Sequence, residues 1–248
     1  MHKLAIAAAL FLAAAIPSFA ADDCPVPWGY TVDNGPATWG RYSAICASGL
    51  SQSPVKINNL LPSPATNLPT LSFQGGPSRF RVKNNQHDLE VYPVNQWTLQ
   101  PFGARLTKFH FHVPAEHLDG NTRHDAEAHF VYELGNRIFA IAVWIDQVNQ
   151  GGNAALQKIA AVQRPGLCLM SPLSLPAATL NILDFLPDRN NYAAYHGSLT
   201  TPPCTENVTF FIMRTPITAT ATQIGALKLV VPAPPGNARP VQQTKWRR

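Results

Sequence analysis

The residues best suited to chemistry are His110 and His112, which alternate with two phenylalanines in the run FHFH. On a β-strand, side chains two residues apart project from one face, so both imidazoles would share a side while the phenylalanines are buried behind them. His129 lies on a second strand-like segment, where it shares a face with Glu127 and Val131. Three histidines on a rigid sheet suit catalytic zinc, which takes three protein ligands and leaves a fourth position for water.

Other metal-binding patterns fit this segment less well. The metallo-β-lactamase pattern requires Asp-His shortly after the H-x-H, whereas Val113 and Pro114 follow here, and H-E-x-x-H is absent. A cupin motif is closer, because a glycine precedes the histidines and Glu116 follows them, but its first spacing is one residue too long and its closing glycine is missing. A cupin-like site with histidine and carboxylate ligands therefore remains an alternative.

Strand-like segments must position these histidines. Alternating or continuous apolar runs predict strands at 79–83, 89–92, 106–113, 126–134, 138–145 and 208–213. Helices are fewer: Asn153 can cap a helix over 154–162, and Thr220 to Gln223 form a capping-box pattern that opens a helix toward Leu229. The sequence predicts a single domain, a β-rich α/β mixture built on a large, mostly antiparallel sheet.

Composition limits the classes of function. A chain of 248 residues with 46% apolar residues can bury a sizeable core. Charged residues make up only 13%, and the net charge of +5 reflects few acidic residues more than many basic ones. The basic residues are scattered apart from a short cluster at Lys245, Arg247 and Arg248. Because no basic stripe could follow a phosphate backbone, we expect no nucleic-acid partner.

Residues 1–20 have the features of a secretory signal peptide. Lys3 precedes an apolar run over 4–15, and small residues surround a cleavage point at Ala20. The run is shorter than the roughly 20 residues that cross a bilayer, and no later stretch is long enough. We expect no membrane span and a periplasmic or secreted mature domain at 21–248, with a retained amphipathic anchor as the alternative. Export makes the four cysteines candidates for disulfides, with three pairings open: Cys24, Cys46, Cys168 and Cys204.

A set of motifs in a fixed order resembles one family. The motifs are Trp28-Gly29-Tyr30, Asn34-Gly35-Pro36 with Trp39, Gln52-Ser53-Pro54-Val55, Phe109-His110-Phe111-His112, Glu116-His117, Glu127-Ala128-His129 and Gly197-Ser198-Leu199-Thr200-Thr201-Pro202-Pro203. Together they resemble the α-class carbonic anhydrases, in particular their exported bacterial members. The resemblance implies a central twisted sheet of about ten strands and a catalytic domain over 21–248.

The resemblance also implies a reaction and its metal. It places Zn²⁺ on His110, His112 and His129, where zinc-bound hydroxide attacks CO₂ to give bicarbonate and a proton. Thr200 would accept a hydrogen bond from the nucleophile and donate one from its own hydroxyl to Glu116, which orients the nucleophile. The partners would be CO₂ and bicarbonate, and a homodimer is possible.

Further residues match family positions in the cleft. His87 matches a proton shuttle, an imidazole that titrates near neutral pH. Residues implied to order water are Tyr30, Asn85 and Thr201, residues implied to form the apolar CO₂ wall are Val131 and Leu199, and Glu127 would support the metal ligands. Cys46 and Cys204 match the disulfide of exported members, which would pin the loop that carries Thr200.

Three positions depart from the family pattern. Lys108 stands where the family usually has a glutamine that accepts a hydrogen bond from His110, and lysine cannot accept one. Glu90 replaces a nearby amide, so we hypothesise a Glu90–Lys108 ion pair in place of two amides. Phe210 replaces a tryptophan at the base of the apolar wall. A non-catalytic binding module on the same fold is the other alternative, although such relatives generally lack one or more of the zinc-binding histidines.

Overall fold

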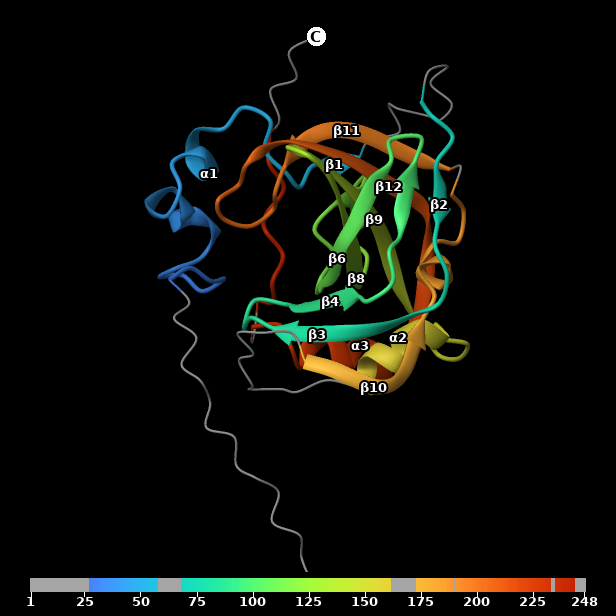
Figure 1. The fold of residues 1–248 in the computed structure, drawn as a ribbon. Helices are drawn as coiled ribbons and strands as arrows, with labels where there is room; N and C mark the ends of the chain where they lie inside the picture. Colours follow the sequence, from blue (N-terminus) through green and yellow to red (C-terminus); the bar gives the residue numbers. More distant parts are fainter. Residues whose placement is uncertain (1–26, 58–67, 162–172, 190, 233–234, 244–248) are drawn as a thin grey trace, which may run out of the picture.

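A large mixed β-sheet forms the centre of the structure (Figure 1). The structure is a computed structural model that describes residues 27–57, 68–161, 173–189, 191–232 and 235–243. The predicted signal segment 1–20, Cys24 and Cys168 lie outside these residues. Within them, the sheet has ten strands.

The strand order across this sheet is β10 (Leu173–Leu180), β3 (Ser78–Asn84), β4 (Leu89–Pro93), β6 (Ala104–His112), β8 (Ala126–Leu134), β9 (Arg137–Val148), β12 (Glu206–Thr220) and β11 (Tyr192–Ser198). β5 (Thr98–Gln100) pairs with β6 and also with β2 (Ser72–Gln74). All of these pairs are antiparallel except β9 with β12. A separate parallel pair joins β1 (Lys56–Ile57) to β7 (Leu118–Asp119). The predicted fold class, a β-rich single domain on a mostly antiparallel sheet, is confirmed.

The middle of the sheet is buried on both faces. On β9, Phe139 and Ile141 belong to the main core, whereas Ala140 and Trp144 belong to a second apolar cluster on the opposite face. A strand covered on both sides needs apolar residues at every position. This requirement explains why 138–145 is a continuous apolar run rather than an alternating one.

A β-bulge shapes the strand that carries two of the histidines. The pairing of β6 with β8 shifts register between Leu106 and Lys108. Leu106 and Phe109 are three residues apart, so in a regular strand they would face opposite sides, yet both are buried in the main core. The bulge buries both side chains on one face and leaves His110 to project from the other.

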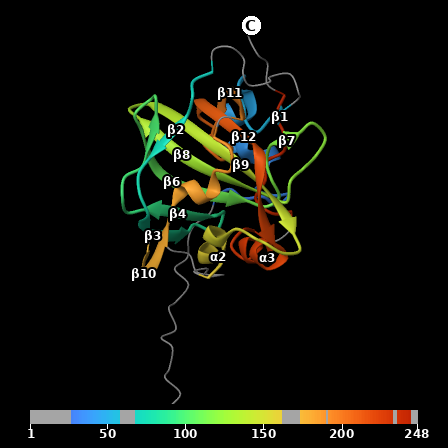
Figure 2. The ribbon, with the colours of Figure 1, turned by 90° about the vertical axis from the view of Figure 1, so that its right-hand side faces the viewer.

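The two predicted helices are confirmed. Asn153 caps α2 (Ala154–Ala160) by accepting hydrogen bonds from the first turn, and Thr220 with Gln223 forms the capping box of α3 (Ala221–Lys228). α2 and α3 contact each other and lie together at one end of the sheet (Figure 2). The remaining short helices are η1 (Pro36–Arg41), α1 (Ile45–Ser48) and η2 (Ile182–Phe185). None of the helices in the described ranges is long and apolar enough to cross a lipid bilayer.

The observed strands are generally longer than predicted. β12 continues to Thr220 and β9 to Val148, while α2 ends at Ala160 rather than at 162. The six strands that the sequence did not predict are β1, β2, β5, β7, β10 and β11. Four of these have only two or three residues, too few for a periodic pattern to be visible.

Candidate metal centre

β6 and β8 bring three histidines together on one face of the sheet. Their antiparallel register places His110 directly opposite His129, and His112 follows two residues along β6. The donor nitrogens of all three lie within 4.8 Å of one another, and Nε2 of His110 is 3.1 Å from Nε2 of His112. All three side chains are buried. The structure thus assembles the three histidines that the sequence indicated.

The second nitrogen of two of these rings has a fixed partner. Nδ1 of His112 lies 2.9 Å from the carbonyl oxygen of Asn237, and Nε2 of His129 lies 2.7 Å from Oε1 of Glu127. Each ring therefore presents its other nitrogen to the cluster. Burial lowers the pKa of His112 to about 3, and burial together with His112 lowers that of His110 well below its usual value. His110 and His112 are therefore uncharged at neutral pH, as metal ligands must be.

A neighbouring cluster shares His129 but is a hydrogen-bonded network rather than a second metal site. His117, Glu127 and His129 also have donor atoms within 4.8 Å of one another. However, Nδ1 of His117 is 2.6 Å from Glu127, and its Nε2 is 2.6 Å from the Tyr195 hydroxyl. Burial raises the pKa of Glu127, but His117 and His129 outweigh burial and hold it well below its usual range. The network fixes the orientation of His129.

Glu116 and Thr200 lie together beside the histidines, as the resemblance implied. Oε2 of Glu116 is 3.4 Å from Nε2 of His112, and its Oε1 accepts a hydrogen bond of 2.9 Å from the backbone N–H of Arg239. Burial raises the pKa of Glu116 to about 7, opposed by His129, by the Arg239 amide and by a side-chain hydrogen bond with Thr200. A cation held by the histidines would favour the ionised carboxylate.

The predicted ion pair in the polar wall is present. The ammonium of Lys108 contacts Oε1 of Glu90, and the Tyr92 hydroxyl donates to Oε2 of Glu90 at 2.6 Å. Burial raises the pKa of Glu90, but Lys108 together with Tyr92 and Lys83 outweighs burial and lowers it. Among the described residues, Nδ1 of His110 has no hydrogen-bond partner. This is the expected consequence of a lysine where an acceptor would stand.

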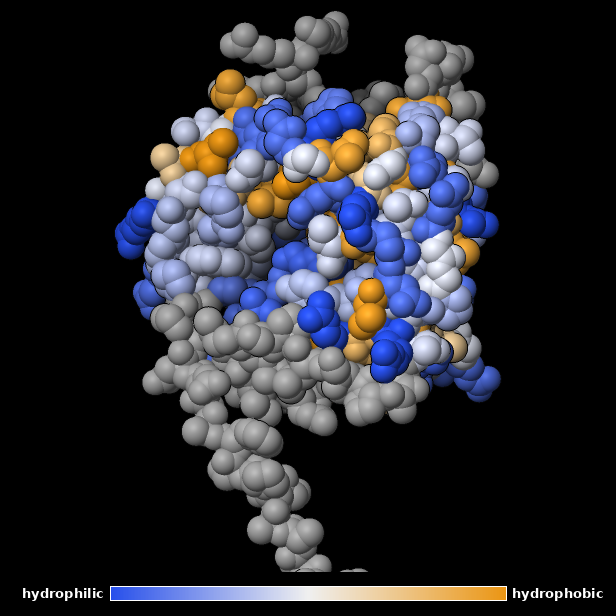
Figure 3. Space-filling view, viewed as in Figure 1, coloured by the Kyte–Doolittle hydropathy of each residue, from blue (hydrophilic) through white to orange (hydrophobic). Residues whose placement is uncertain are grey.

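A cavity of about 350 Å³ opens onto the histidines. Its polar side is lined by Asn85, His87, Asp88, Glu90, Lys108, Thr200 and Thr201, and its apolar side includes Val131, Ile138, Leu199, Val208 and Phe210. The face seen in Figure 3 is hollowed near its centre, close to where Figure 1 labels β6 and β8, with hydrophilic and apolar residues both present at the rim. One wall is therefore suited to water and charge, and the other to an apolar substrate.

His87 lies flat against an aromatic ring. Its centroid is 3.5 Å from that of Trp28, with 6° between the ring planes, and Tyr30 meets both rings edge-on. The Asn85 side chain accepts a hydrogen bond from the backbone N–H of His87. Burial lowers the pKa of His87 to about 4, so the ring is uncharged at neutral pH. Its role as a proton shuttle stays a prediction.

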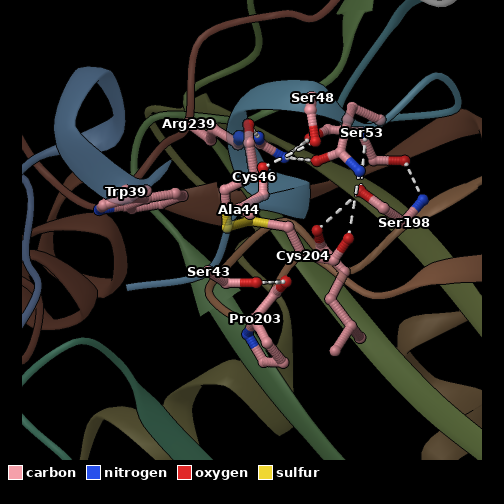
Figure 4. Close-up of a disulfide and its surroundings, with 12 residues drawn as sticks. Trp39, Ser43, Ala44, Cys46, Ser48, Ser53, Ser198, Pro203, Cys204 and Arg239 are labelled. Atoms are coloured by element: carbon pink, nitrogen blue, oxygen red, sulfur yellow. Dashed lines mark hydrogen bonds between the residues drawn. A yellow bond between two sulfur atoms is a disulfide. The ribbon is translucent and has the colours of Figure 1, made fainter. Parts of the chain in front are cut away.

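A disulfide anchors the loop that carries Thr200. Cys46, on α1, is bonded to Cys204, as the resemblance implied (Figure 4). The backbone N–H of Cys204 donates to the Thr201 carbonyl at 2.8 Å, and the Ser43 hydroxyl donates to the Pro203 carbonyl at 2.9 Å. The N-terminal segment and the loop are thus fastened to each other at two points.

Two residues near the C-terminus complete the site and were not predicted. The Asn237 side chain donates to the Phe111 carbonyl at 2.9 Å and accepts from the Val113 N–H at 2.8 Å. Arg239 is only 2% exposed, and its guanidinium donates to the Ser53 carbonyl at 2.8 Å (Figure 4). The only signal in the sequence is an Asn and an Arg in a proline-rich segment, which does not show that both are buried.

Comparison with known proteins agrees with this geometry. The Eukaryotic-type carbonic anhydrase family model matches residues 34–248. A carbonic anhydrase of Pectobacterium carotovorum is 32% identical over 253 residues, which cover 99% of this chain and 97% of that relative. A carbonic anhydrase of Neisseria gonorrhoeae is 34% identical over 219 residues, which cover 85% of this chain and 82% of that relative.

Solved structures give the same result. The α-carbonic anhydrase of Photobacterium profundum has a TM-score of 0.77 at 31% identity, covering 88% of this chain and 97% of that one. The enzyme from Thermovibrio ammonificans, in complex with the inhibitor sulfanilamide, has a TM-score of 0.78 at 30% identity, covering 88% and 96%. Fold and matches define an enzyme of the lyase class, a carbonate dehydratase. The chain belongs to the α-type carbonic anhydrase family.

Proposed function

We propose that this chain is a zinc enzyme that catalyses the reversible hydration of CO₂ to bicarbonate and a proton. The observation that carries the proposal is the cluster of His110, His112 and His129, whose donor nitrogens lie within 4.8 Å of one another. The Asn237 carbonyl and the Glu127 carboxylate bond to the ring nitrogens of His112 and His129 that point away from the cluster. Buried partners of this kind are what fixed metal ligands require.

The donor set fits zinc. Three neutral imidazoles without a thiolate are typical of catalytic zinc sites that keep one position open. Zn–N bonds of about 2.05 Å in a tetrahedron put two ligand nitrogens roughly 3.3 Å apart, close to the 3.1 Å between the Nε2 atoms of His110 and His112. The cavity gives access from solvent to this position.

The protein residues around this position orient the reactants. A zinc ion supplies a water that ionises near neutral pH, a property for which carbonic anhydrase itself is the standard example. Thr200 lies beside Glu116. When its hydroxyl donates a hydrogen bond to that carboxylate, the hydroxyl oxygen is left to accept one from the attacking water. Arg239 holds Glu116 through its backbone N–H. The nucleophile is thereby aimed at the substrate before reaction, which lowers the entropic cost of the step.

The apolar wall receives CO₂. Val131, Leu199 and Phe210 line the cavity beside His129, and a substrate without charge or dipole gains from contact with them rather than with water. Phe210 stacks on Tyr195 with 5.1 Å between ring centroids. The Tyr195 ring therefore packs against the phenylalanine that stands in place of tryptophan. Bicarbonate, being charged, leaves toward the polar wall.

The experiment that tests the proposal is stopped-flow measurement of CO₂ hydration before and after chelation. We expect hydration that is lost with the chelator and restored by added zinc. Bound metal without turnover would contradict the proposal and favour a binding module on the same fold. The presence of all three histidines counts against that alternative.

We also propose that the chain is exported. The signal features of residues 1–20 and the Cys46–Cys204 disulfide support an oxidising compartment. Mass spectrometry of protein from the bacterial periplasm or medium is expected to find a chain that begins after Ala20. A chain retaining residues 1–20 on the membrane would favour the anchor instead. The homodimer stays a prediction.

A further inference from the structure

A buried carboxylate in the polar wall of the cavity has no role in the mechanism described so far. Asp88 directly follows His87, lines the same cavity and is only 6% exposed. Its Oδ1 has no hydrogen-bond partner among the described residues. A buried acceptor oxygen without a partner is costly, so its persistence beside an active site calls for an explanation.

The strand register places Asp88 close to the metal ligands. Val91 of β4 pairs with Phe109 of β6, and both side chains are buried in the main core. Because side chains alternate along a strand, Glu90 on β4 and Lys108 and His110 on β6 face the cavity instead. Asp88 lies two residues before Glu90 and lines this cavity as well. The two carboxylates thus share the wall that contains His110.

The charges around Asp88 come from four parts of the chain. Lys108 on β6 is ion-paired with Glu90, and Lys83 on β3 lies 3.8 Å from Glu90. The titratable or charged groups that face Asp88 are Tyr30 in the N-terminal segment, Lys83 on β3, Glu90 and Tyr92 on β4, and Lys108 on β6. Lys108 already neutralises Glu90, whereas Asp88 forms no ion pair of its own with any residue in the described part of the chain.

These surroundings raise the pKa of Asp88. Burial, and next the charge of Glu90, raise the pKa of Asp88 to about 7, against the opposing effects of Lys108, Asn85 and Lys83. By contrast, burial lowers the pKa of neighbouring His87 to about 4. A base transfers protons best when its pKa lies near the working pH. Of these two adjacent groups, Asp88 meets that condition at neutral pH.

We propose that Asp88 accepts the proton released by CO₂ hydration and passes it to buffer at the mouth of the cavity. The inference rests on the proposed function. Each turnover converts CO₂ and water into bicarbonate and one proton. That proton adds to the Asp88 carboxylate to give the neutral acid, directly or through cavity water, and the acid then loses it to a buffer base. In the dehydration direction the neutral acid of Asp88 is the proton donor.

The substitution Asp88→Asn in the zinc-loaded enzyme tests this role by stopped flow. In dilute, bulky buffer we expect kcat for hydration to fall on the order of 100-fold. We expect kcat/KM, which reports steps before proton release, to stay within about twofold. Added imidazole, small enough to enter the cavity, should restore kcat. His87→Ala should lower kcat less than Asp88→Asn does.

The matched control is Asp33→Asn, the same chemical change at an exposed position, which should leave kcat unchanged. An Asp88→Asn enzyme with the wild-type kcat and pH profile overturns the role of Asp88. A parallel loss of kcat and kcat/KM without imidazole rescue also overturns it, since that pattern marks a structural role. Wild-type protein without zinc-dependent hydration would instead contradict the proposed function itself.

A second measurement does not depend on turnover. The carboxylic-acid C=O stretching band in infrared difference spectra should titrate near pH 7 in the wild type and in Asp33→Asn. Asp88→Asn should remove the part of this band that belongs to Asp88 and leave the part that belongs to Glu116, whose pKa burial also raises to about 7. Identical bands in the wild type and in Asp88→Asn would overturn the proposal. A wild-type spectrum with no carboxylic acid titrating in this range would overturn the proposal.

Discussion

Lys108 of β6 and Glu90 of β4 form an ion pair across two neighbouring strands, beside a metal-ligand candidate, His110, whose Nδ1 has no partner among the described residues. An acceptor at position 108 would fix the tautomer of that ring. The lysine instead donates to Glu90 in the polar wall. The ion pair and the unpartnered nitrogen are thus two consequences of one substitution.

Changing this pair should strengthen zinc binding. Lys108→Gln provides a carbonyl oxygen for the N–H of His110, so we expect the zinc dissociation constant to fall by about 10- to 100-fold. Competition with a coloured chelator measures this constant. Glu90→Gln completes a double-mutant cycle on turnover, and the two changes should be non-additive because the residues are in contact. A coupling energy of zero would show that the ion pair has no effect on catalysis.

Removing the Thr200 hydroxyl should impair turnover but not metal binding. Thr200→Ala eliminates the hydrogen bond that orients the nucleophile, and we expect kcat/KM for CO₂ hydration to fall on the order of 100-fold. Thr200→Ser keeps the hydroxyl and serves as the control, with a much smaller loss. Zinc content should be the same in both variants. An alanine variant with the wild-type rate would contradict the assignment of Thr200.

The disulfide should contribute both to stability and to the geometry of the active-site loop. It encloses a sequence separation of 158 residues, for which the chain-entropy model gives on the order of 4 to 5 kcal/mol. We expect Cys46→Ser combined with Cys204→Ser to lower the free energy of unfolding in urea and to lower kcat/KM. A reducing agent should affect the wild type but not this variant. Unchanged stability and activity after reduction would show that the bridge is dispensable.

The sequence predicted best what depends on local pattern. Phe109 and Phe111 are buried in the main core, and His110 and His112 project from the other face of β6, because strand alternation is a local property. The caps at Asn153 and Thr220 are local as well. Ordered motifs spread along the chain could be matched to a family, so Thr200 and Glu116 were expected in one place, and the structure brings them together although they are far apart in sequence.

What the sequence could not show depends on contacts between distant segments. Asn237 and Arg239 join the site only because the C-terminal segment packs against β6 and the N-terminal region. The bulge between Leu106 and Lys108 arises from pairing with β8. The pKa of Asp88 depends on burial, on Glu90 and on Lys108. Glu90 lies in the same segment of sequence, but the pattern within 84–90 shows neither the burial nor the presence of Lys108.

The stability of the protein should depend on pH through His87. An unfolded chain has a histidine pKa of about 6.5, whereas burial lowers the pKa of His87 to about 4. Between these values the unfolded chain binds more protons, so His87 makes stability fall as the pH drops from about 6.5 to about 4. We therefore expect the difference in melting temperature, wild type minus His87→Gln, to become smaller as the pH falls from about 6.5 to about 4. At higher pH this difference should stay constant. A difference independent of pH would contradict the shift.

The most direct test of the account is the zinc content of the purified, oxidised protein, measured by inductively coupled plasma mass spectrometry together with the hydration rate. We predict about one zinc per chain for the wild type, and the loss of both zinc and activity in His129→Ala. His196→Ala, at an exposed histidine of β11, should keep both. A wild-type protein without zinc, or a His129→Ala variant with full zinc and an unchanged rate, would contradict the three-histidine centre.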